Sequence, residues 1–173
     1  LLVVTARDLG YARDEGFYFR ASESYAGWFQ LLLRAPSAAL TRHAVDAAWS
    51  INPEHPPLLK TLFGLSHWLL YEKLHIFSEE GTSFRFPGML LSALGVGVVF
   101  AWGSAATSRR GGLFAALAYG FVPTTFYHAH LTCFDAPIAS LWVAVAYAFW
   151  LSLHGLPERR ARWGIATGVL FGL

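Results

Sequence analysis

The sequence predicts an all-α membrane protein, and two observations lead to this prediction. Only 14% of its 173 residues carry a formal charge and 55% are hydrophobic, whereas about 25% of the residues of soluble domains are charged. The charges are also unevenly distributed, because the only charged residues within 88–157 are Arg109, Arg110 and Asp135. The apolar runs of this block approach the ~20 residues that a helix needs to cross a ~30 Å hydrocarbon core.

Both ends of the sequence are apolar. Residues 1–5 read Leu-Leu-Val-Val-Thr with no basic segment before them, so a cleaved signal peptide is not indicated, and we interpret them as the exit of a spanning helix. The sequence stops within the apolar run 164–173. We therefore expect an internal fragment that cuts one helix at each end.

Residues 7–87 are predicted to form one external segment whose helices lie along the membrane interface. Apolar and aromatic residues recur every three or four positions in its first part, at Tyr18, Ala21, Tyr25 and Leu32. This spacing is typical of an amphipathic helix. Residues 37–49 predict a weaker helix, which ends before the proline-rich turn 52–57 because proline interrupts helical hydrogen bonding.

The stretch Leu58–Ile76 is the ambiguous element of this segment. It is apolar enough to span a membrane, but it carries five ionisable side chains: Lys60, His67, Glu72, Lys73 and His75. Since burying such groups in hydrocarbon is costly, we expect a helix on the outer interface with its polar tips in water. If the stretch spanned instead, Asp14 and His55 would face the cytoplasm.

Transmembrane helices are predicted in the second half of the chain, over 88–106, 112–129, 137–154 and the truncated 163–173. The short loops 107–110 and 157–162 are basic, and basic short loops stay in the cytoplasm. The loop 130–136 and residues 7–87 would then be external. Gly95, Gly97 and Gly112 are small residues suited to close helix packing, and we expect residues 1–173 to form a single membrane domain.

The composition also excludes several kinds of site. The basic residues are not clustered with aromatic ones, so nucleic acid is not an expected partner. A single cysteine, Cys133, excludes an internal disulfide and a cysteine-based zinc site, since both need at least two.

Asp14 and Glu15 are the first candidates for catalysis. They follow the first apolar stub, and Tyr18, a substrate-binding candidate, comes one helical turn later. Paired carboxylates at the membrane surface can activate a hydroxyl acceptor or hold a metal. The alternative is that both acids only complement the positive end of a helix dipole.

A phosphate-binding group is predicted in the turn Glu54-His55-Pro56-Pro57 and the helix start after it. His55 and Lys60 supply an imidazole and an ammonium at the level of lipid headgroups, and Arg85 lies before the first long apolar run. The alternative is contact of these cations with anionic lipid headgroups.

Asp135 is the only acid between Glu80 and Glu158. A carboxylate at the membrane rim indicates function, although an aspartate can also simply cap the following helix. No cofactor is certain from the sequence. A divalent metal is the candidate cofactor, with Glu15, His128, His130 and Asp135 as its candidate ligands.

Five short motifs occur in one order along the chain: Arg13–Tyr18, Glu54–Lys60, Phe84–Pro87, Arg109–Leu113 and Thr132–Pro137. In combination they resemble the amino-terminal part of the GT-C glycosyltransferases of the protein-mannosyltransferase and aminoarabinose-transferase superfamily. The resemblance implies a polytopic GT-C membrane domain with external juxtamembrane helices. It also implies transfer of a sugar from a polyprenyl-phosphate donor, with inversion, to a protein or glycolipid acceptor on the external face.

The resemblance further implies roles for single residues. Asp14 matches the family's catalytic aspartate, the base on the acceptor, while Glu15 supports it or a metal. Lys60 lies near the family's phosphate-contacting lysine, but His55 takes the lysine's place in relatives with Glu-Lys-Pro-Pro, so which of the two meets the phosphate stays open. Asp135 matches a site carboxylate of the second external loop.

Other functions remain open at this point. A transporter or lipid-binding subunit would use the same external residues without chemistry, and a catalytically silent relative would keep the motifs without turnover. Arginine outnumbers lysine by 11 to 2, which indicates a GC-rich bacterial genome and hence the cytoplasmic (inner) membrane. The sequence does not define the sugar, the acceptor or the lipid chain length.

Overall fold

The computed structural model describes all 173 residues and contains helices but no strand, which confirms the predicted all-α class. The chain forms two compact units. The first holds residues 1–89 and 130–133, and the second holds residues 90–129 and 134–173.

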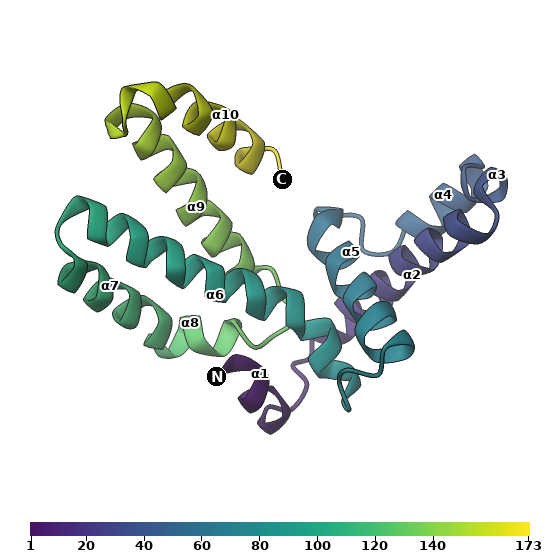
Figure 1. Ribbon diagram of the computed structural model, residues 1–173. Helices are drawn as coiled ribbons and strands as arrows, with labels where there is room; N and C mark the ends of the chain where they lie inside the picture. Colours follow the sequence, from purple (N-terminus) through teal and green to yellow (C-terminus); the bar gives the residue numbers. More distant parts are fainter. The chain divides into compact units, whose positions relative to one another are not determined.

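The first unit is built from short helices around one long helix, α2 (Figure 1). Its elements are α1 (Leu2–Thr5), a 3₁₀ turn (Ala6–Asp8), α2 (Glu15–Arg34), α3 (Pro36–Ala39), α4 (Arg42–Trp49), α5 (Pro57–Ser66), a π-helix (His67–Lys73) and the start of α6 (Glu80–Ala106). The predicted helix around Tyr18 is therefore α2, and the weaker helix predicted over 37–49 is divided between α3 and α4. The ambiguous stretch Leu58–Ile76 is α5 followed by the π-helix.

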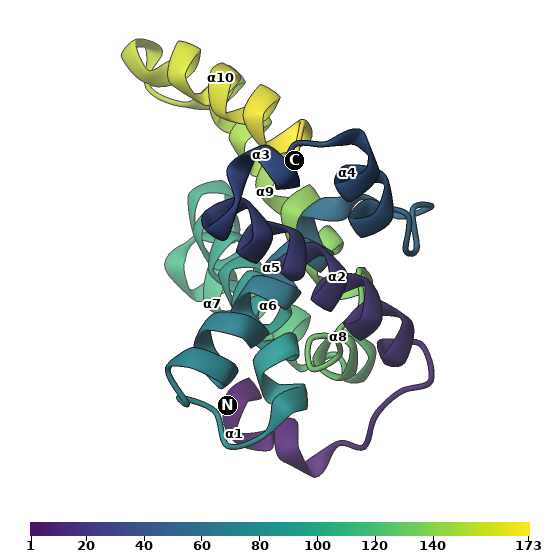
Figure 2. The same ribbon diagram turned by 90° about the vertical axis from the view of Figure 1, so that its right-hand side faces the viewer.

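Helix α2 packs directly against α5, and the two lie side by side in Figures 1 and 2. The contact face of α2 contains the buried residues Ala21, Tyr25 and Ala26. At the crossing point a Cβ atom on Gly64 of α5 would overlap the backbone carbonyl of Ser22. The absence of a side chain at Gly64 is therefore what allows the two backbones to approach this closely.

Replacing Gly64 with alanine is expected to destabilise the first unit by roughly 1–3 kcal/mol, because the added methyl group meets a backbone atom that cannot rotate away. Gly27, on the exposed side of α2, has no atom within 4 Å of an added Cβ. Gly27→Ala is the matched control and should be neutral or stabilising by up to about 1 kcal/mol, through helix propensity. Thermal unfolding of the purified variants in detergent checks both, and equal unfolding temperatures would contradict the close crossing.

Hydrogen bonds from α2 hold the following elements in place. The Trp28 indole N–H donates to the carbonyl of Ala39 at 3.0 Å, and the Tyr25 hydroxyl donates to the carbonyl of Ile51 at 3.0 Å. The Tyr25 and Trp49 rings lie 4.4 Å apart between centroids. These contacts fix the end of α3, the end of α4 and the start of the proline-rich turn against one helix.

Helix α6 continues through a proline. Pro87 has no N–H, so the carbonyl of Ser83 loses its usual helical donor. The Ser66 hydroxyl at the end of α5 donates to that carbonyl at 2.6 Å. A serine side chain thus replaces the missing backbone bond, and it attaches α5 to α6.

The second unit contains the remainder of α6, then α7 (Arg109–Phe121), α8 (Pro123–His128), α9 (Asp135–His154), a 3₁₀ turn (Pro157–Arg159) and α10 (Arg160–Phe171). The prediction of one helix over 112–129 is wrong in its bounds. Ser108 caps α7 through the N–H of Gly111, so the helix starts earlier than predicted. It breaks at Val122, which is extended (φ −58°, ψ 124°) because it precedes Pro123.

In the second unit α6 and α9 run in the same direction and α7 runs opposite to α6. Gly95 of α6 lies against Ser140 of α9, and further along the same helices the rings of Trp102 and Tyr147 are 6.0 Å apart. The predicted role of Gly95 in close packing is confirmed. That of Gly112 is also confirmed, since its Cβ would meet the α6 backbone, but that of Gly97 is wrong because it has no neighbour within 4 Å.

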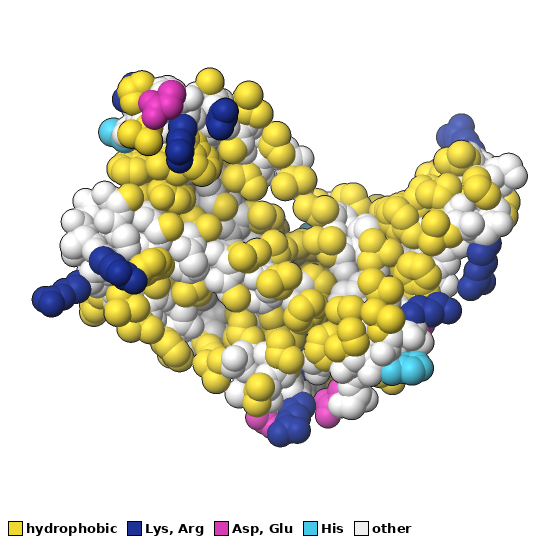
Figure 3. All heavy atoms as spheres, viewed as in Figure 1, with side chains coloured by type: hydrophobic (Ala, Val, Ile, Leu, Met, Phe, Trp, Pro, Cys, Tyr) yellow, Lys and Arg dark blue, Asp and Glu magenta, His cyan; other side chains and the backbone are white.

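Two helices, α6 and α9, are long and apolar enough to cross a membrane by length and composition. Helices α7 and α8 are separately too short for this, since α7 has 13 residues and a span needs ~20. In the second unit the charged side chains gather at the turn between α6 and α7 and around the start of α10, while hydrophobic side chains cover the helices between them (Figure 3).

Candidate functional site

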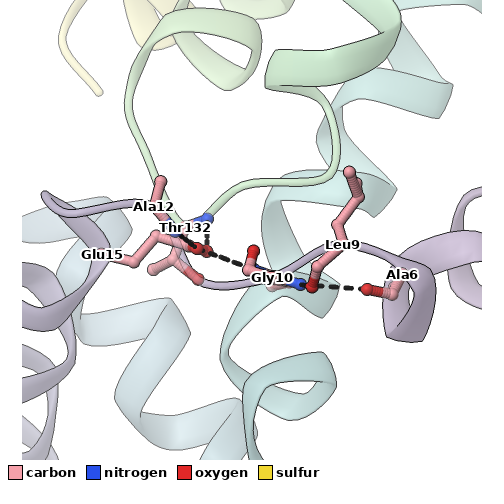
Figure 4. A network of polar contacts seen from close by, with 7 residues as sticks. Ala6, Leu9, Gly10, Ala12, Glu15 and Thr132 are labelled. Atoms are coloured by element: carbon pink, nitrogen blue, oxygen red, sulfur yellow. Dashed lines mark hydrogen bonds and ion pairs between the residues drawn. The ribbon is translucent and has the colours of Figure 1, made fainter.

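A buried ion pair between Glu15 and Arg85 organises the first unit (Figure 4). Both side chains are at most 3% exposed. Arg85 Nε donates to Glu15 Oε1 at 2.8 Å and Nη2 donates to Oε2 at 2.7 Å. The backbone N–H groups of Thr132 and Ala12 donate to the same carboxylate at 2.8 and 2.9 Å.

The other donors of Arg85 bind the start of the chain. Nη1 donates to the carbonyls of Ala6 at 3.0 Å and Leu9 at 3.2 Å, and Nη2 donates to the carbonyl of Gly10 at 2.9 Å. All five N–H groups of the guanidinium are thus used within the protein. The network joins three distant segments: residues 6–15, the first turns of α6 and the loop 130–133.

The electrostatics of Glu15 follow from these bonds. Burial alone raises the pKa of its carboxyl group, but the hydrogen bonds from Arg85, Thr132 and Ala12, together with the charge of Arg85, outweigh burial. The pKa of Glu15 therefore lies below its ordinary value. Glu15 is an ionised carboxylate with its lone pairs occupied, which makes it a support for its surroundings.

Asp14 is in the opposite situation, although it is the next residue along the chain. It precedes α2 as the N-cap residue, and its backbone carbonyl accepts from the N–H of Phe17. Its side chain is exposed, caps no backbone N–H group and makes no hydrogen bond. The alternative role at the helix dipole requires only a carboxylate at the start of α2, and the exposed Asp14 side chain is consistent with it. The Glu15 network holds the loop on which Asp14 stands, so its carboxylate is exposed on a fixed backbone.

The ammonium group of Lys60 is completely buried. Nζ donates to the backbone carbonyl and the side-chain oxygen of Asn52 and, at 3.0 Å, to the carbonyl of His55. Nζ also lies 5.1 Å from the Tyr25 ring centroid. Burial lowers the pKa of Lys60, against the opposing effect of the Glu54 charge. Lys60 thus holds the proline-rich turn against the helices α2 and α5.

A shallow open pocket lies between the start of α2 and this turn. Its lining consists of Phe17, Arg20, Ile51, Asn52 and Glu54. Tyr18 and His55, two predicted site residues, are the chain neighbours of the lining residues Phe17 and Glu54. The centroids of their rings are 6.0 Å apart. Asp14 stands one helical turn before Phe17, so it is on the adjoining part of the helix.

Arg20 is a residue of this pocket that the sequence analysis did not select. Its side chain is exposed, and no hydrogen bond or ion pair engages it. Since the donors of Lys60 and Arg85 are already used, Arg20 is the guanidinium that remains available to an anion in this pocket. The signal in the sequence was its place outside the apolar positions Ala21 and Tyr25 of α2, which leaves its side chain exposed.

The candidate metal ligands lie in two places: Glu15 and His130 are in the first unit, and His128 and Asp135 face each other in the second. His130 Nε2 is 2.7 Å from the Thr5 hydroxyl in the first unit, where Glu15 pairs with Arg85. In the second unit Asp135 begins α9 and its carboxylate lies 3.4 Å from His128 Nδ1. The roles predicted for these residues stay predictions, because these contacts do not test them.

The chain was compared with known protein families, and a family model matches more than half of it. The model described as dolichyl-phosphate-mannose-protein mannosyltransferase matches residues 55–173, which confirms the resemblance found in the sequence. No curated protein and no solved structure matches the chain. The matched range includes His55, Lys60, Arg85 and Asp135 but not Asp14, whose candidacy depends on its position and on the motif around it.

Proposed function

Because this chain belongs to the dolichyl-phosphate-mannose-protein mannosyltransferase family, whose members are integral-membrane glycosyltransferases, we propose that it uses a polyprenyl-phosphate sugar donor. The sugar passes with inversion to a hydroxyl acceptor, on a protein or a glycolipid, at the external face of the membrane. A bacterial inner membrane is the proposed location.

The observation that carries this proposal is the contrast between Asp14 and Glu15. Glu15 has its charge and lone pairs compensated by Arg85 and two backbone N–H groups. Asp14 has no such partner and stands beside the pocket at the start of α2. A general base must be positioned within reach of the proton that it accepts. In this proposal Asp14 is the general base, and Glu15 holds the loop that carries it.

The proposed reaction is a single displacement at the anomeric carbon. Asp14 accepts the proton of the acceptor hydroxyl while the acceptor oxygen forms a bond to the anomeric carbon. The bond from that carbon to the phosphate oxygen breaks, and the polyprenyl phosphate leaves with the electron pair. Arg20 and His55 are the proposed contacts for the negative charge that develops on this phosphate, while Lys60 positions the turn that carries His55.

The orientation of the second unit supports the external face. Helices α6 and α9 run in the same direction, and a basic segment follows each of them, at 107–110 and 157–162. If both helices span the membrane, these basic segments lie on one side, which the positive-inside rule identifies as the cytoplasm. The start of α6 and the residues just before it then lie on the external side. Asp135, the first residue of α9, starts on that side too, and we assign it no chemical step.

The test is the release of polyprenyl phosphate by the full-length protein in membranes, with acceptor proteins and glycolipids present. Polyprenyl-phosphate sugars should support release, whereas the matching nucleotide sugars should not. The anomeric configuration of the product, measured by NMR, should be opposite to that of the donor. Binding of the lipid donor without release, for any acceptor supplied, would favour a lipid-binding or transport function.

A further inference from the structure

A second cluster of ionisable side chains lies in the first unit, and none of its members has a role in the proposed function. Glu23 of α2, His67 at the start of the π-helix and Glu80 at the start of α6 place one ligand atom each within 4.8 Å of the others. Glu72, at the far end of the π-helix, adds an oxygen 3.5 Å from His67 Nε2. Three elements that lie far apart in the sequence thus bring carboxylates to one imidazole ring.

The ring of His67 is held rigidly. The residue is 6% exposed, and its ring stacks on Phe84 at 4.1 Å with an angle of 7° and on Tyr71 at 5.2 Å. Its Nδ1 lies 2.9 Å from the Ser83 hydroxyl oxygen. Packing and one hydrogen bond therefore determine the direction in which Nε2 points.

The Ser83 contact also determines which nitrogen carries the proton in the neutral ring. The single hydroxyl proton of Ser83 is donated to the carbonyl of Glu80 at 2.5 Å, so the Ser83 oxygen accepts from His67 Nδ1–H. The lone pair of the neutral imidazole is then on Nε2. A hydrogen bond that fixes the other ring nitrogen in this way is the usual arrangement around metal-bound histidines.

Carboxylate groups gather around the ring of His67. The Glu72 carboxylate lies 3.5 Å from Nε2, and Glu23 and Glu80 each place a carboxylate oxygen within 4.8 Å of a ring nitrogen of His67. A neutral ring whose lone pair faces a carboxylate is poorly satisfied unless a cation lies between the two groups. The π-helix contributes to this arrangement, because its wider turn brings Glu72, five residues after His67, back toward the ring.

We propose that Glu23, His67 and Glu80, with Glu72 as a fourth ligand, bind a divalent metal ion with the preferences of zinc. One imidazole nitrogen and carboxylate oxygens are ligands that zinc accepts, at about 2.0–2.2 Å. Glu23 and Glu80 are exposed, so their side chains can rotate to close these distances. The metal would join α2, the π-helix and α6, and this role does not depend on the proposed glycosyl transfer.

The test is the zinc content of the full-length protein in detergent, measured by mass spectrometry after chelation and dialysis against zinc-buffered solution. The wild type should retain one zinc ion per chain more than Glu23→Gln or Glu80→Gln, whose exposed side chains make no hydrogen bond needed for folding. Ser83→Ala should keep the ligands but weaken zinc binding about 10–100-fold, because His67 loses its orienting partner.

His43→Gln is the matched control, since His43 is an exposed histidine of α4 outside the cluster; it should retain the wild-type zinc content. Zinc should also raise the unfolding temperature of the wild type and of His43→Gln, but not that of Glu23→Gln. The proposal is overturned if the wild type and Glu23→Gln retain the same amount of zinc.

Discussion

Asp14→Asn is expected to lower the rate of sugar transfer by roughly 100- to 10,000-fold, the usual contribution of a general base. The amide has almost the shape of the carboxylate but cannot accept the acceptor proton. The folded structure should not change, because the Asp14 side chain makes no hydrogen bond that the substitution could break. The measurement is the initial rate of polyprenyl-phosphate release at saturating donor, in membranes that contain equal amounts of each protein.

The control for this experiment is Asp8→Asn. Asp8 is an exposed aspartate in the 3₁₀ turn a few residues earlier, and its replacement makes the same change in net charge. It should leave the rate close to that of the wild type. A loss of kcat in Asp14→Asn with a small change in KM would support the role as base, because the interaction is used in the transition state. Full turnover in Asp14→Asn would end the assignment.

Glu15→Gln is expected to destabilise the first unit by about 3–5 kcal/mol, the range measured when one partner of a buried ion pair is removed. The glutamine amide group would face N–H donors of Arg85 or the backbone, and the buried guanidinium would keep its charge without compensation. Since a whole domain is stable by only about 5–15 kcal/mol, much of this protein should be unfolded or degraded. The unfolding temperature in detergent measures the loss.

Glu79→Gln is the matched control, because Glu79 is exposed and its replacement should be nearly neutral. Arg85→Lys should also destabilise, because an ammonium group cannot reproduce the five donors or the two-pronged contact with the carboxylate. Wild-type stability for Glu15→Gln would mean that the network does not hold the first unit together.

The same ion pair predicts a dependence of stability on pH. The pKa of Glu15 is lower in the folded protein than its ordinary value, so the unfolded chain takes up a proton first as the pH falls. The contribution of Glu15 is complete above the pKa of an unfolded glutamate, about 4.3, and decreases as the pH falls from there through the folded pKa. The Glu15→Gln variant should lack this part of the pH dependence.

Local patterns in the sequence determined where the main helices lie. The spacing of Tyr18, Ala21 and Tyr25 predicted α2, and the two long runs with few charges predicted α6 and α9, because hydrophobic periodicity and length act within one segment. The bounds of the helix predicted over 112–129 were wrong because Ser108 caps α7 earlier and Pro123 interrupts it. The Ser108 cap and Pro123 are both local signals, but the prediction followed the apolar composition of the run and did not use them.

Several side-chain roles were decided only by the tertiary structure. Glu15 and Arg85 are 70 residues apart in the sequence, yet they form one buried pair that also binds Thr132. No local pattern could indicate this, since burial and partners follow from how distant segments pack. The same holds for Lys60, whose cation is used by the turn before it, and for His67, whose environment comes from α2 and α6.

The sequence by itself therefore determined the helical class, the positions of the long helices, the family and the short list of ionisable residues. The tertiary structure decided which of those residues have their charge paired inside the protein and which are exposed and available to a substrate. The physical reason is that hydrophobicity and helix propensity are properties of neighbouring residues, whereas the charge state and the availability of a buried group depend on desolvation and on partners from elsewhere in the chain. Asp14 and Glu15 are adjacent acids in the sequence, and only the fold gives them different surroundings.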